Sequence, residues 1–347
     1  MKTFQQFEKK AENIPTATAW YLADLGEARG KQELFTRQSP QKLKILREHA
    51  LIESAVSSNR IEGVTVDQKR VGTVVFGKRH LKDRSEEEVR CYRTALDWIH
   101  REGEKIPISE KTVLKLHQMS RGEIWDAGKY KQKNVDIIEK FPRGRVRVRF
   151  KTVEASKTPV AMKKLFEAWQ DSLKEKNVHP LIALAAFNLD FLCVHPFRDG
   201  NGRVSRLLLL LQCYLLGLEV GRYISLERLI EQNKERYYET LEQSSQGWHE
   251  GKHDPWPYIN YLLYILKTAY QEFESRVGQM KSPRGAKTEL VEVAIASFEK
   301  EFAISDVEKA CPGVSRDMIR IVMNRLRKQS QLKILGCGRD AKWSKLK

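Results

Sequence analysis

The sequence predicts a mainly α fold: a helical core with one β-hairpin, followed by a small C-terminal domain of helices and short strands. Two apolar runs, residues 181–194 and 207–216, are each too short to span a bilayer and are typical of buried helices. Only residues 134–150 carry the alternation and central turn of a hairpin. After a linker at residues 282–285, three short helical patterns precede two short strands.

Composition limits the class of protein and of partner. Of 347 residues, 31% are charged and 41% hydrophobic, which is typical of a folded chain rather than a disordered one. The net charge of +17 favours polyanionic partners: nucleotide phosphates, nucleic acid or acidic protein surfaces. Five scattered cysteines without C-x-x-C spacing indicate a reducing compartment and argue against structural zinc. Residues 1–6 lack an apolar signal core, so we expect a cytoplasmic protein without a membrane segment.

The helices are predicted from their apolar spacing. Residues 1–40 form an N-terminal arm packed on the core, residues 42–60 a helix that ends near Gly63, and residues 64–82 a connector. Ser109 is expected to cap a helix whose His117 is structural, because no second metal ligand lies at helical spacing. Further helices are expected at residues 86–101, 159–173, 180–195, 230–246 and 256–273.

The most informative stretch is the polar loop at residues 195–206, His-Pro-Phe-Arg-Asp-Gly-Asn-Gly-Arg-Val-Ser-Arg, between the two buried helices. That much charge beside a core is costly without partners. Gly200 and Gly202 let the backbone approach a ligand just before a helix, where N–H groups and the positive end of the dipole face the loop. Arg203 and Arg206 lie three apart on one helix face, which suits a polyphosphate.

Two further residues of the loop suggest chemistry. Asp199 is a lone carboxylate beside those phosphates, which suits a bridging Mg²⁺ ion. His195 can take a proton near neutral pH. A glycine-rich helix cap with surface arginines and a packed histidine would explain any one of these residues alone. The whole set predicts a bound nucleotide, a metal ion and a general base.

The loop resembles the signature of the Fic family, His-Pro-Phe-x-(Asp/Glu)-Gly-Asn-Gly-Arg-x-x-Arg, at every fixed position. The resemblance extends over about residues 42–275 and implies a protein adenylyltransferase. Such an enzyme moves AMP from ATP to a Ser, Thr or Tyr hydroxyl of a target protein, which can be the chain itself, and releases pyrophosphate.

The family assigns roles to the loop. His195 would take the hydroxyl proton, and Asp199 would bind Mg²⁺. Asn201 and the amides of the two glycines would hold the phosphates. Arg203 would bind the β-phosphate and Arg206 the γ-phosphate, while Phe197 anchors the loop in the core.

A second stretch, residues 57–63, precedes the core. Ser58 and Glu62 are i, i+4 neighbours on one helix face, and alone they would indicate a solvated glutamate at a helix end. Beside the loop, they resemble the inhibitory helix of Fic proteins, (Ser/Thr)-x-x-x-Glu-(Gly/Asn). The resemblance implies that Glu62 occupies Arg206 and keeps the γ-phosphate out, with Ser58 close to the nucleotide.

The hairpin has two interpretations. Its second strand alternates Val146, Val148 and Phe150 with basic residues on the other face, as an edge hairpin kept soluble by charge would. In the Fic family a hairpin of this kind, the flap, covers the loop and pairs with an extended target segment. A basic flap would suit an acidic target. The family also places a tyrosine near the adenine, and of the adjacent Tyr237 and Tyr238 at most one can face the site.

The C-terminal part is predicted to form helices at residues 289–302, 304–310 (opened by Ser305) and 315–329, then two strands within residues 332–346. This order resembles the winged-helix family. Its third helix would present four arginines to DNA phosphates, or a solvated basic face in a protein-binding module: Arg316, Arg320, Arg325 and Arg327.

The predicted domains are an N-terminal arm with the inhibitory helix (1–82), a Fic catalytic core (83–280) and a winged-helix domain (284–347). Three other functions stay open. The same site can remove AMP, with Glu62 orienting a water. It can transfer a different phosphate-containing group, as in some members of the family, or a DNA-binding regulator can use it to sense nucleotide. A homodimer is compatible with the resemblance, because dimerisation controls the inhibitory helix in some relatives.

Overall fold

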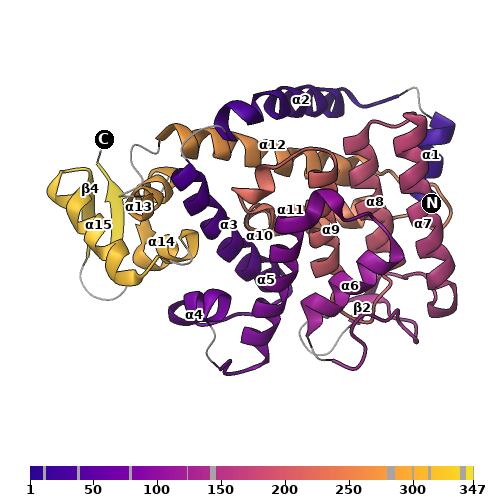
Figure 1. Ribbon diagram of the computed structural model, residues 1–347, viewed down its shortest axis with the longest axis horizontal. Coiled ribbons are helices and arrows are strands. Elements are labelled where there is room, and N and C mark those ends of the chain that lie inside the picture. The colour runs from indigo at the N-terminus through magenta and orange to yellow at the C-terminus, as the bar shows by residue number, and fades with distance from the viewer. Residues whose placement is uncertain are drawn as a thin grey trace.

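Helices make up most of the structure, a computed structural model that describes residues 1–10, 13–36, 40–77, 80–122, 124–140, 146–279, 286–298, 301–311, 314–336 and 341–346. A large helical core fills the centre and right of Figure 1, and a smaller group of C-terminal elements lies at its left. The predicted mainly α fold is confirmed. None of the described helices is long and apolar enough to cross a membrane.

The N-terminal arm consists of two helices, α1 (Lys2–Lys10) and α2 (Thr16–Thr36). Helix α2 lies along the long helix α12 (Trp256–Gln279), as Figure 1 shows. The Thr18 hydroxyl donates a hydrogen bond to Asn260 Oδ1 at 2.7 Å between these two helices. The predicted packing of the arm on the core is therefore confirmed.

Helix α3 (Pro40–Ile61) ends where the sequence predicts. Gly63 follows with a φ of +83°, a conformation that glycine adopts without a steric penalty and that ends many helices. The connector behind it contains a turn of 3-10 helix (Gln68–Arg70) and the short helix α4 (Val71–Phe76).

Four more predicted helices are present, with small shifts at their ends. They are α5 (Arg84–Glu102), α6 (Glu110–Arg121), α7 (Thr158–Glu175) and α8 (Pro180–Val194). The Ser109 side chain accepts a hydrogen bond from the Thr112 N–H at 3.3 Å, so Ser109 caps α6 as predicted.

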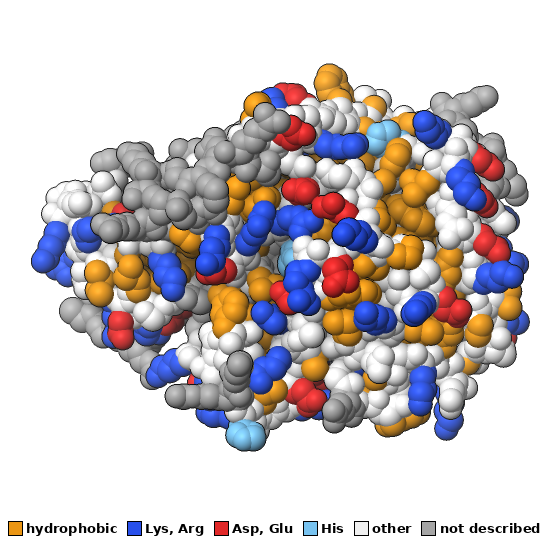
Figure 2. All heavy atoms as spheres, viewed as in Figure 1, with side chains coloured by type: hydrophobic (Ala, Val, Ile, Leu, Met, Phe, Trp, Pro, Cys, Tyr) orange, Lys and Arg blue, Asp and Glu red, His pale blue; other side chains and the backbone are white. Residues whose placement is uncertain are grey.

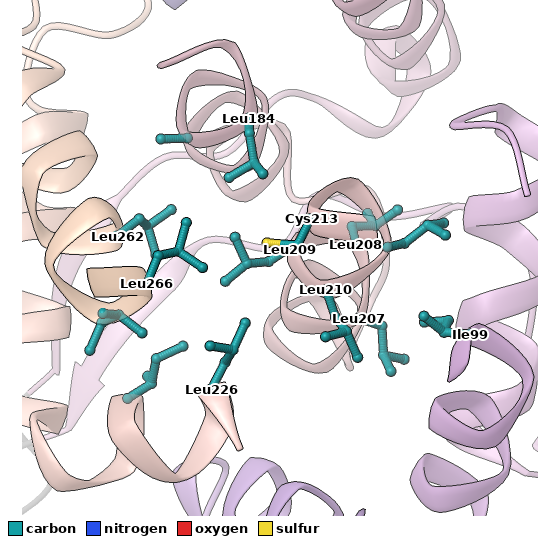
Figure 3. Packing of buried hydrophobic residues seen from close by; sticks show 14 of the residues in the cluster. Ile99, Leu184, Leu207, Leu208, Leu209, Leu210, Cys213, Leu226, Leu262 and Leu266 are labelled. Carbon is teal, nitrogen blue, oxygen red and sulfur yellow. The ribbon is translucent and has the colours of Figure 1, made fainter. Parts of the chain in front are cut away.

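Helix α9 (Asn201–Leu215) lies in the middle of the core, surrounded by other helices. Figure 3 shows its leucines 207–210 between Leu184 of α8, Ile99 of α5 and residues of α10 and α12. Burial on every side explains why the sequence here is a continuous apolar run without helical period. Each fully buried leucine contributes about 1.5–3 kcal/mol to folding, so the polar loop between α8 and α9 sits on a rigid base.

The single helix predicted at residues 230–246 is wrong. The chain forms α10 (Leu226–Gln232) and α11 (Lys234–Ser245) instead. The Asn233 side chain donates to the Leu229 carbonyl at 2.9 Å and thereby occupies an acceptor at the end of α10. A side chain that bonds a nearby carbonyl competes with the continuing helix, which accounts for the break.

The predicted hairpin is present as the antiparallel pair β1 (Ile137–Lys140) and β2 (Val146–Phe150), while its tip, residues 141–145, lies outside the described residues. The hairpin rests on the core, because the Phe150 ring stacks on His249 with centroids 5.4 Å apart. Exposed Val148 pairs across the strands with Ile138, which is also exposed.

Two arginines of β2 contact one carboxylate of the core. Arg149 forms an ion pair with Glu242 of α11, and Arg147, which stays largely exposed, approaches the same carboxylate at 3.4 Å. These contacts attach the hairpin to α11. The preference of the hairpin for an acidic target stays a prediction.

The C-terminal module has helices α13 (Ala286–Ser297), α14 (Ile304–Ala310) and α15 (Arg316–Lys328). Its strands β3 (Phe302–Ala303), β4 (Leu332–Leu335) and β5 (Lys342–Lys345) form an antiparallel sheet in the order β3-β5-β4. The module has its own buried core, which agrees with a separate domain: Val291, Ile295, Phe302, Val307, Cys311, Val314, Ile319, Val322, Met323, Leu326, Leu332 and Trp343. The domain boundaries and the winged-helix assignment stay predictions.

Two details of the module differ from expectation. The first helix ends at Ser297 rather than continuing to Phe302, because Phe302 pairs with Trp343 in the sheet. Helix α14 has the predicted bounds, but Ser305 does not cap it: Ala303 is the N-cap residue, and its N–H donates to Asp306 Oδ2 at 2.8 Å.

The arginines of α15 are largely paired within the module. Arg316 bonds Glu308 at 2.6 Å, Arg325 forms an ion pair with Glu292, and Arg320 lies 3.8 Å from Asp317. Figure 2 shows Lys and Arg side chains spread over the face in view rather than gathered on this module. Both a DNA partner and a protein partner of this module stay predictions.

The N-terminal helix is fastened to the core at Asp190 of α8, which is fully buried. The Thr3 hydroxyl donates to Asp190 Oδ1 at 2.6 Å, and the Thr3 N–H donates to the same carboxylate at 3.2 Å. The Trp248 indole donates to Asp190 Oδ1 at 2.6 Å. Burial raises the pKa of Asp190 to about 6, and these hydrogen bonds oppose the rise.

This shift predicts a pH dependence of stability. A raised pKa means that the folded state binds the Asp190 proton more tightly than the unfolded state does. The protonated carboxyl therefore stabilises the fold fully below the pKa of the unfolded state, near 3.8, and this stabilisation is lost as pH rises through about 6. We expect the free energy of unfolding to fall by about 3 kcal/mol across this window. Urea titrations of wild type and Asp190→Asn measure it, and an equal slope in both proteins would contradict this assignment.

Candidate active site

The polar loop begins where α8 ends. His195 caps the helix in a left-handed conformation, φ 52°, and its N–H donates to the Phe191 carbonyl at 2.9 Å. Phe197 is fully buried, as expected of an anchor, and its ring stacks on His117 with centroids 3.8 Å apart. His117 Nε2 lies 3.0 Å from the Asp199 carbonyl, so His117 is structural, as predicted, and supports the loop.

Asn201 braces the loop from within. Its Oδ1 accepts from the Phe197 N–H at 2.9 Å, and its Nδ2 donates to the Phe197 carbonyl at 2.8 Å. Both the oxygen and the nitrogen of the side-chain amide are therefore hydrogen-bonded to Phe197. In this structure the side chain braces the loop, and its expected contact with phosphates stays a prediction. The first intrahelical hydrogen bond of α9 starts at the Val204 N–H, which leaves the N–H groups of the preceding turn directed at the loop.

Asp199 is the acidic group of the loop, with 60% of its side chain exposed. Arg121 of α6 is buried and places Nη1 2.8 Å from Asp199 Oδ2. Partial burial alone would raise the pKa of Asp199, but Arg121 and Arg203 outweigh it and hold the pKa below its usual value. Asp199 is therefore a carboxylate at neutral pH.

Arg203 is buried beneath the loop. Its Nη1 donates to Glu88 Oε2 of α5 at 2.6 Å and to Asn59 Oδ1 of α3 at 3.3 Å. The sequence predicts Arg203 as a phosphate ligand and gives no sign of these partners, because Glu88 stands 115 positions away. In this structure the guanidinium links three helices behind the loop.

Arg206 meets the stretch that the sequence singles out near residue 60. Its Nε donates to Ser58 Oγ at 2.9 Å, and its Nη2 donates to the Ser58 carbonyl at 3.0 Å and to Glu62 Oε1 at 2.7 Å. A Cβ atom at Gly202 would overlap the Glu62 carboxylate in this position, so Glu62 lies directly against the backbone of Gly202. Glu62 thus lies over the first turn of α9, on the predicted arginine.

The two tyrosines of α11 have different surroundings. Tyr237 is buried among aromatic rings, with Tyr261 at 5.8 Å and Tyr258 at 6.1 Å between centroids. Tyr238 is half-buried, and its hydroxyl lies 3.5 Å from the Ile61 carbonyl at the end of α3. Of the pair, Tyr238 is the one on the open side of the site.

The imidazole of His195 is neutral at physiological pH. Burial, together with the nearby charge of Lys131, lowers its pKa to about 4. A neutral, half-buried imidazole can accept a proton from a hydroxyl group brought to the loop.

The arrangement combines helix N–H groups, two arginines, one exposed carboxylate and a neutral histidine at a helix start. These groups suit binding of an anion that carries several negative charges, together with proton transfer. In the part of the chain described, no group of three or more His, Cys, Asp or Glu could hold a metal ion alone.

Part of the chain matches a known family model. Residues 107–213 match the model of the Fic/DOC family. The protein adenylyltransferase Fic of Drosophila sechellia is 25% identical over 207 residues, 53% of this chain and 37% of the fly protein. That of Drosophila virilis is 23% identical over 246 residues, 69% of this chain and 47% of the fly protein. The chain thus spans less than half the length of these curated relatives.

Solved structures share the fold. A Fic family protein from Desulfovibrio desulfuricans G20 superposes with a TM-score of 0.60 at 24% identity, over 96% of this chain and 97% of that one. A Fic domain containing signaling protein from Bacteroides thetaiotaomicron VPI-5482 gives 0.60 at 20% identity, over 75% and 99%. The first match extends over nearly the whole chain.

Proposed function

Because the chain carries a Fic/DOC family domain, we propose that it is a protein adenylyltransferase. It transfers AMP from ATP to a Ser, Thr or Tyr hydroxyl of a protein and releases pyrophosphate. The observation that carries this proposal is the loop geometry. A neutral His195 lies at the start of the loop, and the N–H groups of α9 with Arg203 and Arg206 lie at its end. The relatives named protein adenylyltransferase Fic support it.

The reaction follows from these positions. His195 takes the proton of the target hydroxyl, whose oxygen attacks the α-phosphorus while pyrophosphate leaves. The N–H groups at the start of α9 stabilise the charge that develops on the phosphate oxygens. Arg203 attracts the β-phosphate from its buried position, and Arg206 holds the γ-phosphate once Glu62 has moved away. Tyr238 borders the adenine.

A magnesium ion fits the donor set at the loop. Asp199 is a partly exposed carboxylate, and Mg²⁺ is commonly held by one or two carboxylates together with substrate phosphates rather than by an all-protein cage. Asp199 would hold the ion, and Mg²⁺ would supply charge neutralisation of the phosphates. The contact of Asp199 with Arg121 keeps the carboxylate turned towards the loop until then.

We further propose that Glu62 is inhibitory. Its carboxylate occupies the guanidinium that the γ-phosphate needs, and Ser58 fixes the same arginine from one helical turn earlier. The target segment is proposed to extend along the hairpin. Arg147 and Arg149 already pair with Glu242, whereas the apolar side chains of Ile138 and Val148 are exposed. We therefore expect the target segment to present apolar side chains to the hairpin.

The proposed function predicts AMP on protein. Incubation of a Glu62→Gly variant with ATP and Mg²⁺ is expected to leave AMP on the chain itself or on proteins of an added lysate, as detected by mass spectrometry. Asp199→Asn on that background should lower the rate by about 100-fold, because the charge that neutralises the phosphates is lost. Asp171→Asn, at an exposed position on α7, is the matched control. Equal rates in both variants would remove Asp199 from the mechanism.

A further inference from the structure

Lys131 lies where the active-site loop meets the hairpin, and its side chain is almost fully buried. Its Nζ donates to the Val194 carbonyl at 3.2 Å, directly before His195 in the chain. Its backbone N–H donates to the Pro196 carbonyl at 2.9 Å, directly after His195. Residue 131 therefore bonds the carbonyl groups of the two residues on either side of the proposed base, Val194 and Pro196.

The same ammonium group reaches the foot of the hairpin. Lys131 Nζ donates to Thr152 Oγ1 at 2.8 Å, and the Thr152 hydroxyl donates to the Val135 carbonyl at 2.6 Å. Val135 precedes β1 and Thr152 follows β2, so the start of β1 and the end of β2 lie close to this point. One side chain thus connects the two ends of the hairpin to the residue before His195.

Charge distinguishes this contact from ordinary packing. The acceptors of the Lys131 ammonium are a hydroxyl and a backbone carbonyl, and among the described residues no carboxylate lies within 4.0 Å of it. Burial lowers the pKa of Lys131 to about 8, against the opposing charge of Asp136. Burial of an ammonium group costs free energy, and this one lies beside His195. Its positive charge lowers the pKa of the imidazole, whereas the charges of Glu62 and Asp199 raise it.

We propose that Lys131 is a positioning residue of the transfer reaction. It joins the hairpin to the carbonyl groups of Val194 and Pro196, the residues on either side of His195, so that the target segment and the base are held in a fixed relative geometry. This inference rests on the proposed function. A misplacement of about 1 Å in a reacting group can cost on the order of 100-fold in rate. Lys131 belongs to neither of the two sequence motifs, so residue order alone indicates no role for it.

The test uses full-length protein on the Glu62→Gly background. Lys131→Met should lower kcat by about 100-fold, and Lys131→Arg, which keeps a cation and donors, should restore part of it. Thr152→Val cuts the link to the hairpin but keeps the cation, so it should raise KM for the protein target by about fivefold. Lys133→Met, two residues along and exposed, should leave both constants unchanged.

A second readout does not need activity. The ring of His195, followed by NMR, should titrate at higher pH in Lys131→Met and at the unchanged pH in Thr152→Val. If the Glu62→Gly parent transfers AMP while Lys131→Met keeps its kcat and its His195 titration, the inference is overturned and the proposed function stands. If the parent transfers nothing, the proposed function fails, and the His195 titration still decides whether Lys131 acts on the base.

Discussion

Glu62→Gly is expected to raise the rate of AMP transfer by about 10- to 100-fold over wild type. In the structure the Glu62 carboxylate accepts a charge-assisted hydrogen bond from Arg206 Nη2 at 2.7 Å. Bonds of this kind contribute about 1.5–3 kcal/mol, and their loss frees Arg206 for the γ-phosphate. Initial rates of label incorporation from ATP at saturating Mg²⁺ measure the change.

The control separates loss of the carboxylate from loosening of the helix end. Arg60, two residues before Glu62, pairs with Glu231 of α10 at 3.3 Å. Glu231→Ala removes that contact at the same end of α3 and should leave the rate near the wild-type value. Equal activation by both variants would show that mobility of α3, and not the carboxylate on Arg206, limits the reaction.

The second large effect concerns the base. His195→Ala on the Glu62→Gly background should reduce transfer by about 10²–10⁴-fold, the usual range for removal of a general base. ATP binding should change little, because the arginines and helix N–H groups that attract the phosphates are untouched. Calorimetric titration with ATP checks the binding, and single-turnover rates check the transfer. A double variant that transfers as fast as Glu62→Gly alone would exclude His195 as the base.

The core of the fold was predictable from local sequence. The apolar runs of α8 and α9 predict buried helices because residues 181–194 and 207–216 are apolar except for Asn188, Asp190 and Gln212, a composition that burial on all sides accounts for. The break at Asn233 was not predictable from pattern. Asparagine is tolerated in helices, and its bond to the Leu229 carbonyl depends on how α10 and α11 pack.

The site, like the fold, was predictable from the sequence only in part. His195, Asp199 and Arg206 belong to one contiguous motif, so their proximity was predictable from residue order. Arg121 and Glu88 lie far from the loop in sequence and reach it only through the packing of α5 and α6.

The contact of Glu62 with Arg206 spans 144 positions, and only its likeness to a family pattern brought it forward. A charge pattern along a strand predicts which residues share a face but not what that face contacts. Arg147 and Arg149 lie on one face of β2, as predicted, and both form ion pairs with Glu242. Tertiary contacts of this kind cannot be derived from spacing along the chain.

The most direct test compares ATP labelled at the α-phosphate with ATP labelled at the γ-phosphate. Wild type, Glu62→Gly, and Glu62→Gly with His195→Ala are incubated in parallel with each, and label on protein is measured. The account predicts α-label on protein that is weak in wild type, strong in Glu62→Gly and absent in the double variant, with γ-label released in pyrophosphate. Retention of γ-label, or no label from either while ATP still binds, would contradict AMP transfer as the function of this site.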